Sequence, residues 1–252
     1  MKIGMPILFE YNSIRENIKL AEDLNFDFIE LNLNFDYCQK ELENKKELLN
    51  LVKSSDLEYT LHFYDEADFA SYDEVCKAYL KLLKKYLKLA KGINIKLVNI
   101  HLNVGPIVTI SGVKNYLYEK EYDVYIERLI RNLNKVKKIC DKYNVQMVLE
   151  NTICPSFIKK TYQDLKEKFT FNYDIGHDYR NDSNLKDMFL NDGFKLNEFH
   201  FHDSTKSKDH LCLGTGEMDL IAYKNMIDNQ YVVLELKSSE DLELSIEYFK
   251  KL

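Results

Sequence analysis

The feature that most constrains the fold of this chain is an eightfold alternation between short apolar runs and segments with helical spacing. The runs are residues 2–8, 26–33, 58–63, 95–102, 145–152, 169–177, 196–202 and 231–237. Each run has the length of a β-strand, and the segments between them repeat apolar residues at three- and four-residue intervals. The first such segment begins with Ser13 and Glu16, a pattern that caps a helix start. The sequence therefore predicts strands and helices in strict alternation.

Alternating strands and helices require parallel strands joined by crossover helices. Eight units within 252 residues predict a single closed (β/α)8 TIM barrel spanning residues 1–252, rather than an open sheet. The connections that lead from strand to helix are the longer ones and carry the unusual residues. We therefore expect the functional site at the C-terminal ends of the strands.

Composition narrows the class of protein. The net charge of -6 argues against broad attraction to nucleic acid or to an anionic membrane. The five cysteines are scattered and form no CxxC pair, which disfavours a disulfide framework or a thiolate zinc site. The N-terminal run is interrupted by Pro6, so it does not read as a signal peptide, and no run reaches membrane-spanning length. These features predict a cytoplasmic protein without a membrane partner, and they leave its oligomeric state open.

The candidate functional residues cluster at the predicted strand ends. All six histidines lie at or just past such an end: His62, His101, His177, His200, His202 and His210. Three acidic residues do the same: Glu150, Asp174 and Glu235. A charged side chain facing into an apolar barrel is costly without a partner, and the ends of barrel strands converge on one mouth. Imidazole and carboxylate together suit zinc, manganese or iron, so the set predicts a divalent-metal site.

Each residue also has a structural explanation when it is taken alone. A histidine at a strand end commonly caps the strand, Asp174 and His177 could stabilise a turn, and Glu150 could pair with a lysine. The metal hypothesis is favoured because the sequence has no histidine anywhere else. Glu30 lies before its strand end, and a hydrogen-bonded carboxylate inside the barrel would account for it.

These motifs resemble the xylose-isomerase-like barrel superfamily, which holds sugar-phosphate isomerases and epimerases together with the endonuclease IV family of abasic-site nucleases. The motifs are LHF at His62, NIHLNVG at His101, VLENT at Glu150, YDIGH at Asp174, HFHDS at His200, DHLCLGTGEMD at His210 and VLELK at Glu235. The resemblance covers nearly the whole chain. It is specific as a set, whereas any one motif alone would be weak.

The resemblance implies one to three divalent ions, zinc or manganese. It implies a central ion bound by Glu150, Asp174, His200 and Glu235. In the nuclease branch, Glu150 shares a second ion with His62 and His101. A third ion there is bound by His177, His210 and an aspartate two residues before that histidine.

The chain departs from the nuclease pattern at two positions. Lys208 occupies the place of the aspartate, and Asp209 next to it is expected to point in a different direction. His202 stands where the nucleases usually have asparagine.

The isomerase branch implies a metal-dependent isomerase or epimerase acting on a sugar or sugar phosphate through an enediolate. Glu150 and Glu235 would then transfer protons. His177, His202 and Lys208 would bind substrate. Lys114, Arg180 and Lys206 also lie in mouth loops and could meet a phosphate.

Two alternatives stay open. The first is a zinc-dependent phosphodiesterase that cleaves DNA at abasic sites, although the acidic loop YDEADFASYDE after the third strand should repel a phosphate backbone. The second is a barrel that only binds a ligand or partner.

Overall fold

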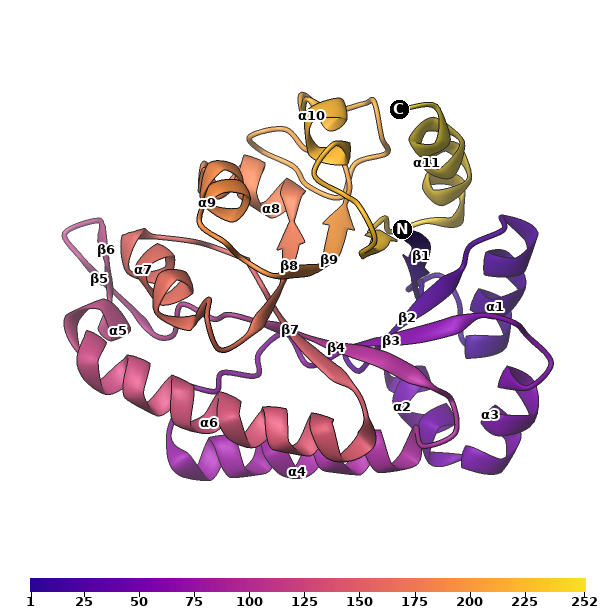
Figure 1. Ribbon diagram of the computed structural model, residues 1–252, viewed down its shortest axis with the longest axis horizontal. Helices are drawn as coiled ribbons and strands as arrows, with labels where there is room; N and C mark the ends of the chain where they lie inside the picture. The colour runs from indigo at the N-terminus through magenta and orange to yellow at the C-terminus, as the bar shows by residue number, and fades with distance from the viewer.

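The computed structural model describes residues 1–252, apart from the side chain at position 45. Eight parallel strands close into a barrel in the order β1-β10-β9-β8-β7-β4-β3-β2 (Figure 1). The strands are β1 (Lys2–Pro6), β2 (Phe28–Asn32), β3 (Glu58–His62), β4 (Ile95–His101), β7 (Gln146–Glu150), β8 (Thr170–Asp174), β9 (Leu196–Phe201) and β10 (Tyr231–Leu234). The predicted closed parallel barrel is confirmed, and each predicted run contains one of these strands.

The helices lie between the strands on the outside of the barrel. They are α1 (Ile14–Asp23), α2 (Asp36–Glu43), α3 (Lys45–Val52), α4 (Asp73–Leu89), α5 (Leu117–Lys120), α6 (Tyr122–Tyr143), α7 (Ser156–Leu165), α8 (Ile175–Arg180), α9 (Lys186–Asn191), α10 (Leu220–Lys224) and α11 (Ser239–Lys251). The predicted cap of α1 is confirmed, because the Ser13 Oγ accepts the Glu16 backbone N–H at 3.2 Å.

Two helix predictions were wrong in detail. The charge pattern of residues 41–53 predicts one helix, but this segment is divided into α2 and α3 at Asn44, whose ψ of 55° lies outside the helical range. The sequence also suggests a helix cap near Thr161, but Thr161 does not cap its helix. It lies inside α7 and donates its hydroxyl to the Phe157 carbonyl at 2.8 Å, as threonine commonly does one turn along a helix.

The long loop after the fourth barrel strand contains a β-hairpin that we did not predict. Strand β5 (Ile107–Ile110) pairs antiparallel with β6 (Val113–Tyr116), and the hairpin projects from the left side of the molecule in Figure 1. Ser111 and Gly112 form its turn with φ values of 50° and 80°. Positive φ at both central residues matches the twist of a tight hairpin. The strict eightfold count therefore holds for the barrel and not for the whole chain.

The barrel interior is polar toward the mouth and apolar at its floor. Glu30 on β2 lies 3.4 Å from His200 on β9, and these strands are not neighbours, so the contact crosses the interior. At the other end the buried ring of Phe28 fills the space in front of Gly4, where a Cβ would lie 2.5 Å from the ring. Interior side chains are thus positioned at the mouth above a closed floor.

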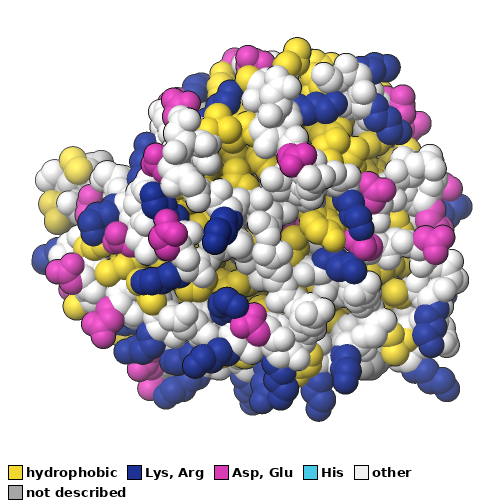
Figure 2. All heavy atoms as spheres, viewed as in Figure 1, with side chains coloured by type: hydrophobic (Ala, Val, Ile, Leu, Met, Phe, Trp, Pro, Cys, Tyr) yellow, Lys and Arg dark blue, Asp and Glu magenta, His cyan; other side chains and the backbone are white. Residues whose placement is uncertain are grey.

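The outer surface is strongly charged. Figure 2 shows Lys and Arg side chains gathered along the lower edge, over α4 and α6. Within the described part of the chain, no helix has the length and apolar character required to cross a bilayer.

Candidate metal centre

Four neighbouring strands bring the predicted central ligands together. Glu150 and Asp174 are the last residues of β7 and β8, His200 lies in β9, and Glu235 follows β10 directly. The side chains of all but Glu235 are at most 1% exposed, and that of Glu235 is 13% exposed. Parallel strands in register end at one level, which is why residues far apart in sequence meet here.

The ligand atoms of these four residues converge on one point. His200 Nδ1 lies 3.0 Å from Glu235 Oε2, 3.5 Å from Glu150 Oε1 and 3.9 Å from Asp174 Oδ2. Three of these four atoms, those of Glu150, His200 and Glu235, are buried without a hydrogen-bond partner among the described residues. Tetrahedral zinc with ligands at about 2.1 Å separates its ligand atoms by roughly 3.4 Å. The donor set therefore fits a divalent cation.

A second group of possible ligands lies on the other side of Glu150. The Oε2 atom of Glu150 is 3.5 Å from His62 Nε2 and 3.6 Å from His101 Nε2. The Nδ1 of His62 lies 2.8 Å from the Phe63 carbonyl oxygen, which can only accept a hydrogen bond. When this ring is neutral, its proton therefore sits on Nδ1, and Nε2 is the atom that faces Glu150 and could bind an ion. Glu150 thus has a group of possible ligand atoms at each of its two oxygens.

A third group joins α8 to the loop after β9. His177 Nε2 lies 3.9 Å from Asp209 Oδ2, and His210 Nδ1 lies 3.2 Å from Asp209 Oδ1. The expectation that Asp209 points away was wrong. His210 has a left-handed backbone with φ of 54°, which bends the chain, whereas adjacent side chains diverge only on extended backbone. Arg180 also forms an ion pair with Asp209.

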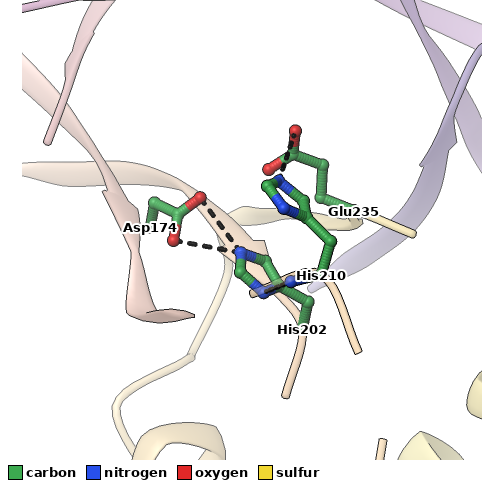
Figure 3. A group of neighbouring side chains, drawn as sticks. All are labelled: Asp174, His202, His210 and Glu235. Carbon is green, nitrogen blue, oxygen red and sulfur yellow. Dashed lines mark hydrogen bonds and ion pairs between the residues drawn. The ribbon is translucent and has the colours of Figure 1, made fainter. Parts of the chain in front are cut away.

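The structure separates the residues predicted to bind substrate. His177 is 17% exposed at the mouth, whereas His202 is fully buried and cannot touch a substrate there. Its ring lies against Asp174 and is stacked on the ring of His210, with 4.3 Å between the ring centroids (Figure 3). The position of His202 two residues after His200 indicates a shared face of the strand, but it does not give the exposure of the side chain. Lys208 is exposed on the loop.

The other predicted phosphate contacts lie further out. Lys114 is exposed on the β5–β6 hairpin, and Lys206 forms an ion pair with Asp182. Arg180 is held by Asp209, as described above. Arg180 and Lys206 are therefore already paired with carboxylates.

The histidines and carboxylates of the site set each other's charge. Burial raises the pKa of Glu150, but His200 and His101 outweigh it and hold this pKa well below its usual range. For Glu235 the same penalty of burial is outweighed by Lys237 and His210, and its pKa is also low. Burial alone would lower the pKa of His62, but Glu150 raises it to about 10. In the metal-free protein, protons on histidine therefore balance the buried carboxylates.

His202 differs from these histidines. Burial lowers its pKa, and the nearby Asp174 does not reverse this shift. We therefore assign it the neutral form.

Below the central group lie two buried carboxylates, Glu30 and Glu198. Both approach His200, and both oxygens of Glu198 and one of Glu30 have no hydrogen-bond partner among the described residues. Burial, followed by the charge of Glu30, raises the pKa of Glu198 well above its usual range. The expectation that Glu30 is an ordinary hydrogen-bonded carboxylate was therefore incomplete, because the Oε1 atom that faces His200 makes no hydrogen bond.

The loop after β9 is organised by one carboxylate. Asp203 accepts backbone N–H groups from Ser204, Gly214, Gly216 and Met218 at 2.8 to 3.3 Å. A Cβ on Gly216 would lie 2.2 Å from Asp203 Oδ1, so glycine allows this close approach. The loop over residues 203–218 is thereby fixed across the mouth, together with its histidine, His210.

Three contributing residues were not singled out from the sequence. Lys237 lies 3.4 Å from Glu235, Asn99 donates to Glu150, and Asp65 lies 3.5 Å from His62 Nδ1. Lys237 and Asn99 are each two residues from a predicted ligand, so the two-residue period of an extended strand could have indicated them. No such periodicity marks Asp65, which lies in a loop.

Comparison of the sequence with protein families shows that the chain belongs to the family described as xylose isomerase-like TIM barrel, which matches residues 18–252. An uncharacterized protein of Methanocaldococcus jannaschii is 29% identical over 220 residues, which are 81% of this chain and 81% of that protein.

Solved structures share the fold over almost the whole chain. A D-tagatose 3-epimerase-like protein superposes with a TM-score of 0.77 at 20% identity, covering 100% of this chain and 96% of the other. The IolI protein with a bound zinc atom superposes with a TM-score of 0.74 at 19% identity, covering 98% and 93%. At these identities the likeness establishes the barrel alone.

Proposed function

We propose that this protein is a divalent-metal-dependent isomerase or epimerase of a sugar or sugar phosphate. The observation that carries the proposal is the convergence of Glu150, Asp174, His200 and Glu235 on one point at the mouth, with three of the four facing atoms buried and unpartnered. The family supports it, as does the likeness to a D-tagatose 3-epimerase-like protein and to a zinc-containing barrel.

These four residues would bind the ion, which when bound would polarise neighbouring carbonyl and hydroxyl oxygens of the sugar and make the adjacent C–H more acidic. Glu150 and Glu235 are suited to move the proton. Their low pKa values keep both ionised at neutral pH, so either can accept a proton from carbon and return it to the neighbouring carbon on the same face. Delivery to the opposite face would require the other glutamate to take up a proton from solvent first. His177, which is partly exposed, would donate a hydrogen bond to a substrate hydroxyl.

The neighbours of each glutamate orient one of its oxygens toward the ion position. Asn99 and Asn172 donate to Oε2 of Glu150, which leaves Oε1 toward the centre. His210 Nε2 lies 3.3 Å from Glu235 Oε1, and Oε2 of the same carboxylate faces His200. Each carboxylate therefore has one oxygen engaged by the protein and the other facing the centre.

The test is exchange of substrate hydrogen with solvent in D2O, followed by NMR over a panel of ketoses, aldoses and their phosphates with added zinc or manganese. Proton transfer through an enediolate predicts deuterium at the carbon that changes configuration. The Glu150→Gln variant should show none, whereas Glu243→Gln on the exposed face of α11 should behave as wild type. Undiminished exchange in Glu150→Gln would exclude its assigned role.

A second candidate is a zinc-dependent phosphodiesterase acting at abasic sites in DNA. Two groups of possible ligands for further ions favour it. In one, His62 and His101 lie around Glu150 Oε2, and in the other Asp209 approaches His177. The acidic loop after β3, where Asp65 is 55% exposed, opposes a phosphate backbone.

Metal content of protein purified without chelator or nickel separates the two functions. About one equivalent per chain, unchanged by His62→Ala, supports the isomerase. Two or three equivalents of zinc, reduced by His62→Ala and accompanied by cleavage of an abasic duplex, support the nuclease.

A further inference from the structure

The residue His202 belongs, with Asp174, His210 and Glu235, to one of the groups that could hold an ion, but its own hydrogen bonds assign it a different role. It follows β9, its side chain is 0% exposed, and its Nε2 lies 3.2 and 3.3 Å from the two oxygens of Asp174. Figure 3 shows the imidazole between Asp174 and the backbone of His210. The ring therefore connects a predicted metal ligand to the loop over residues 203–218.

The hydrogen bonds of His202 determine which ring nitrogen carries the proton. The backbone N–H of His210 points at His202 Nδ1 over 2.8 Å, and an amide N–H can only donate. Nδ1 must therefore accept, so the proton of the neutral ring is on Nε2 and is donated to Asp174. The Asp203 carbonyl oxygen, 3.3 Å from Nδ1, lies further away than this donor.

The opposite side of Asp174 is also fixed. Its Oδ1 accepts the backbone N–H of His177 at 2.6 Å, and its backbone is held on both sides by the Asn151 side chain. With the N–H of His202 added, the carboxylate is held so that Oδ2 faces His200 Nδ1. His177 Nδ1 also lies 3.3 Å from Oδ2, but among the described residues His202 is the one whose side chain forms a hydrogen bond with this carboxylate.

The space for this arrangement is provided by Gly176. A Cβ at that position would lie 1.9 Å from Cε1 and 2.3 Å from Nδ1 of His202, far inside contact distance. Gly176 lies in the first turn of α8, two residues after Asp174. A methyl group there would displace the imidazole without removing any hydrogen-bonding group.

We propose that His202 is a positioning residue, in the Nε2–H tautomer, that couples the loop over residues 203–218 to the orientation of Asp174, and that Gly176 is required to make room for it. The inference rests on the proposed function only through Asp174 as a metal ligand. Partners of this kind behind a ligand commonly change metal affinity by about 10- to 100-fold when removed.

The first test measures zinc affinity by competition with a chromophoric chelator. His202→Leu and His202→Asn should bind zinc about 10- to 100-fold more weakly, because neither can donate from the Nε2 position. His202→Gln places an amide N–H near that position and should retain most of the affinity. Ser207→Ala, in the same loop and exposed, is the matched control.

The Gly176→Ala variant gives an independent result. It should weaken zinc binding as much as His202→Leu, and the double variant should be no weaker than either, because both disturb one interaction. Circular dichroism and thermal unfolding without metal check that each variant is folded. Wild-type affinity in folded His202→Leu or in folded Gly176→Ala would overturn the proposal, as would additive losses in the double variant.

The second test observes the tautomer directly in the metal-free protein by long-range 1H–15N NMR. An unprotonated Nδ1 and a protonated Nε2 on His202 are expected, and a proton on Nδ1, donated to the Asp203 carbonyl, would overturn the proposal. Neither test involves a sugar. A protein that binds zinc and shows these results but isomerises no sugar would contradict the proposed reaction and leave the role of His202 standing.

Discussion

The mouth and the deeper interior of this barrel use the same residue type in opposite charge states. Glu150 and Glu235 at the mouth are surrounded by histidine and lysine, which keep their pKa values low despite burial. Glu198 lies two residues before His200 on the same strand. Its pKa is raised, first by burial and then by the negative charge of Glu30. The comparison shows that charged neighbours, rather than depth, decide which carboxylates can bind a cation or accept a proton.

The largest effect is expected when one of the ionised carboxylates at the mouth is replaced. Glu235→Gln removes a predicted ligand and a proton acceptor at once, so turnover should fall by about 10³-fold or more while the fold is retained. The measurement is the rate of the sugar reaction under saturating metal, with Glu247→Gln on the exposed side of α11 as control. Activity within tenfold of wild type would show that Glu235 is not part of the proton-transfer pair.

Metal binding should depend steeply on pH. Neighbouring carboxylates, Glu150 first, outweigh burial and raise the pKa of His200 well above its usual range, so a cation that binds to the central group must displace a proton. Affinity should therefore rise by about tenfold per pH unit for each proton displaced between pH 6 and 9. Calorimetry in two buffers with different ionisation enthalpies measures the protons released. Binding without proton release would contradict the assigned charge states.

The stability of the metal-free protein should show the same charges. Histidines with raised pKa values stabilise the fold fully below about pH 6.5, their value in an unfolded chain, and this contribution is lost as pH rises toward 9 or 10. Glu198 acts in the same direction, because its native form retains a proton above the pKa of the unfolded chain. The Tm should therefore fall between pH 6.5 and 9, and zinc should oppose the decline.

The Glu198→Gln variant tests the charge state of the interior carboxylate. A glutamine matches the protonated acid, so the variant should unfold about 2–6 °C higher than wild type at pH 8 and at nearly the same temperature at pH 4. Thermal unfolding of metal-free protein at the two pH values gives the result. A lower Tm at pH 8 would mean that Glu198 is ionised and held by a partner.

The smallest effect is expected at the N-terminal end of the barrel, where β1 and β3 begin. Lys2 forms a 2.6 Å ion pair with Glu58, but these side chains are 46% and 22% exposed. Water and salt screen such pairs, so Lys2→Met should change the free energy of unfolding by less than about 1 kcal/mol. Urea unfolding measures it, and a loss of several kcal/mol would show that the rim is as sensitive as the mouth.

Much of the barrel could be predicted because its signals are local. Short apolar runs, helical spacing and a capping pair such as Ser13 and Glu16 each act within a few residues. The ligand set was also accessible, because a charged residue at the end of an apolar strand stands out. Its members meet because parallel strands end at one level, which follows from the fold alone.

The remaining features depend on contacts between distant segments. The depth of His202 follows from the space left by Gly176, the direction of Asp209 from the left-handed backbone at His210, and the charge state of Glu198 from Glu30 on a strand that is not its neighbour. Periodicity does not encode such contacts. The β5–β6 hairpin is an exception, because the turn dipeptide Ser111-Gly112 after the β-branched run Ile107–Ile110 is a local signal that could have indicated it.

The ring of Phe28 in front of Gly4 has a kinetic consequence. Because this ring fills the N-terminal end of the barrel, the products of the proposed reaction must leave through the mouth, by which substrates also enter. Substrate and product would therefore occupy the same site in turn, so accumulated product would compete with substrate for the free enzyme. The progress curve should then bend as product accumulates, before the two sugars reach equilibrium.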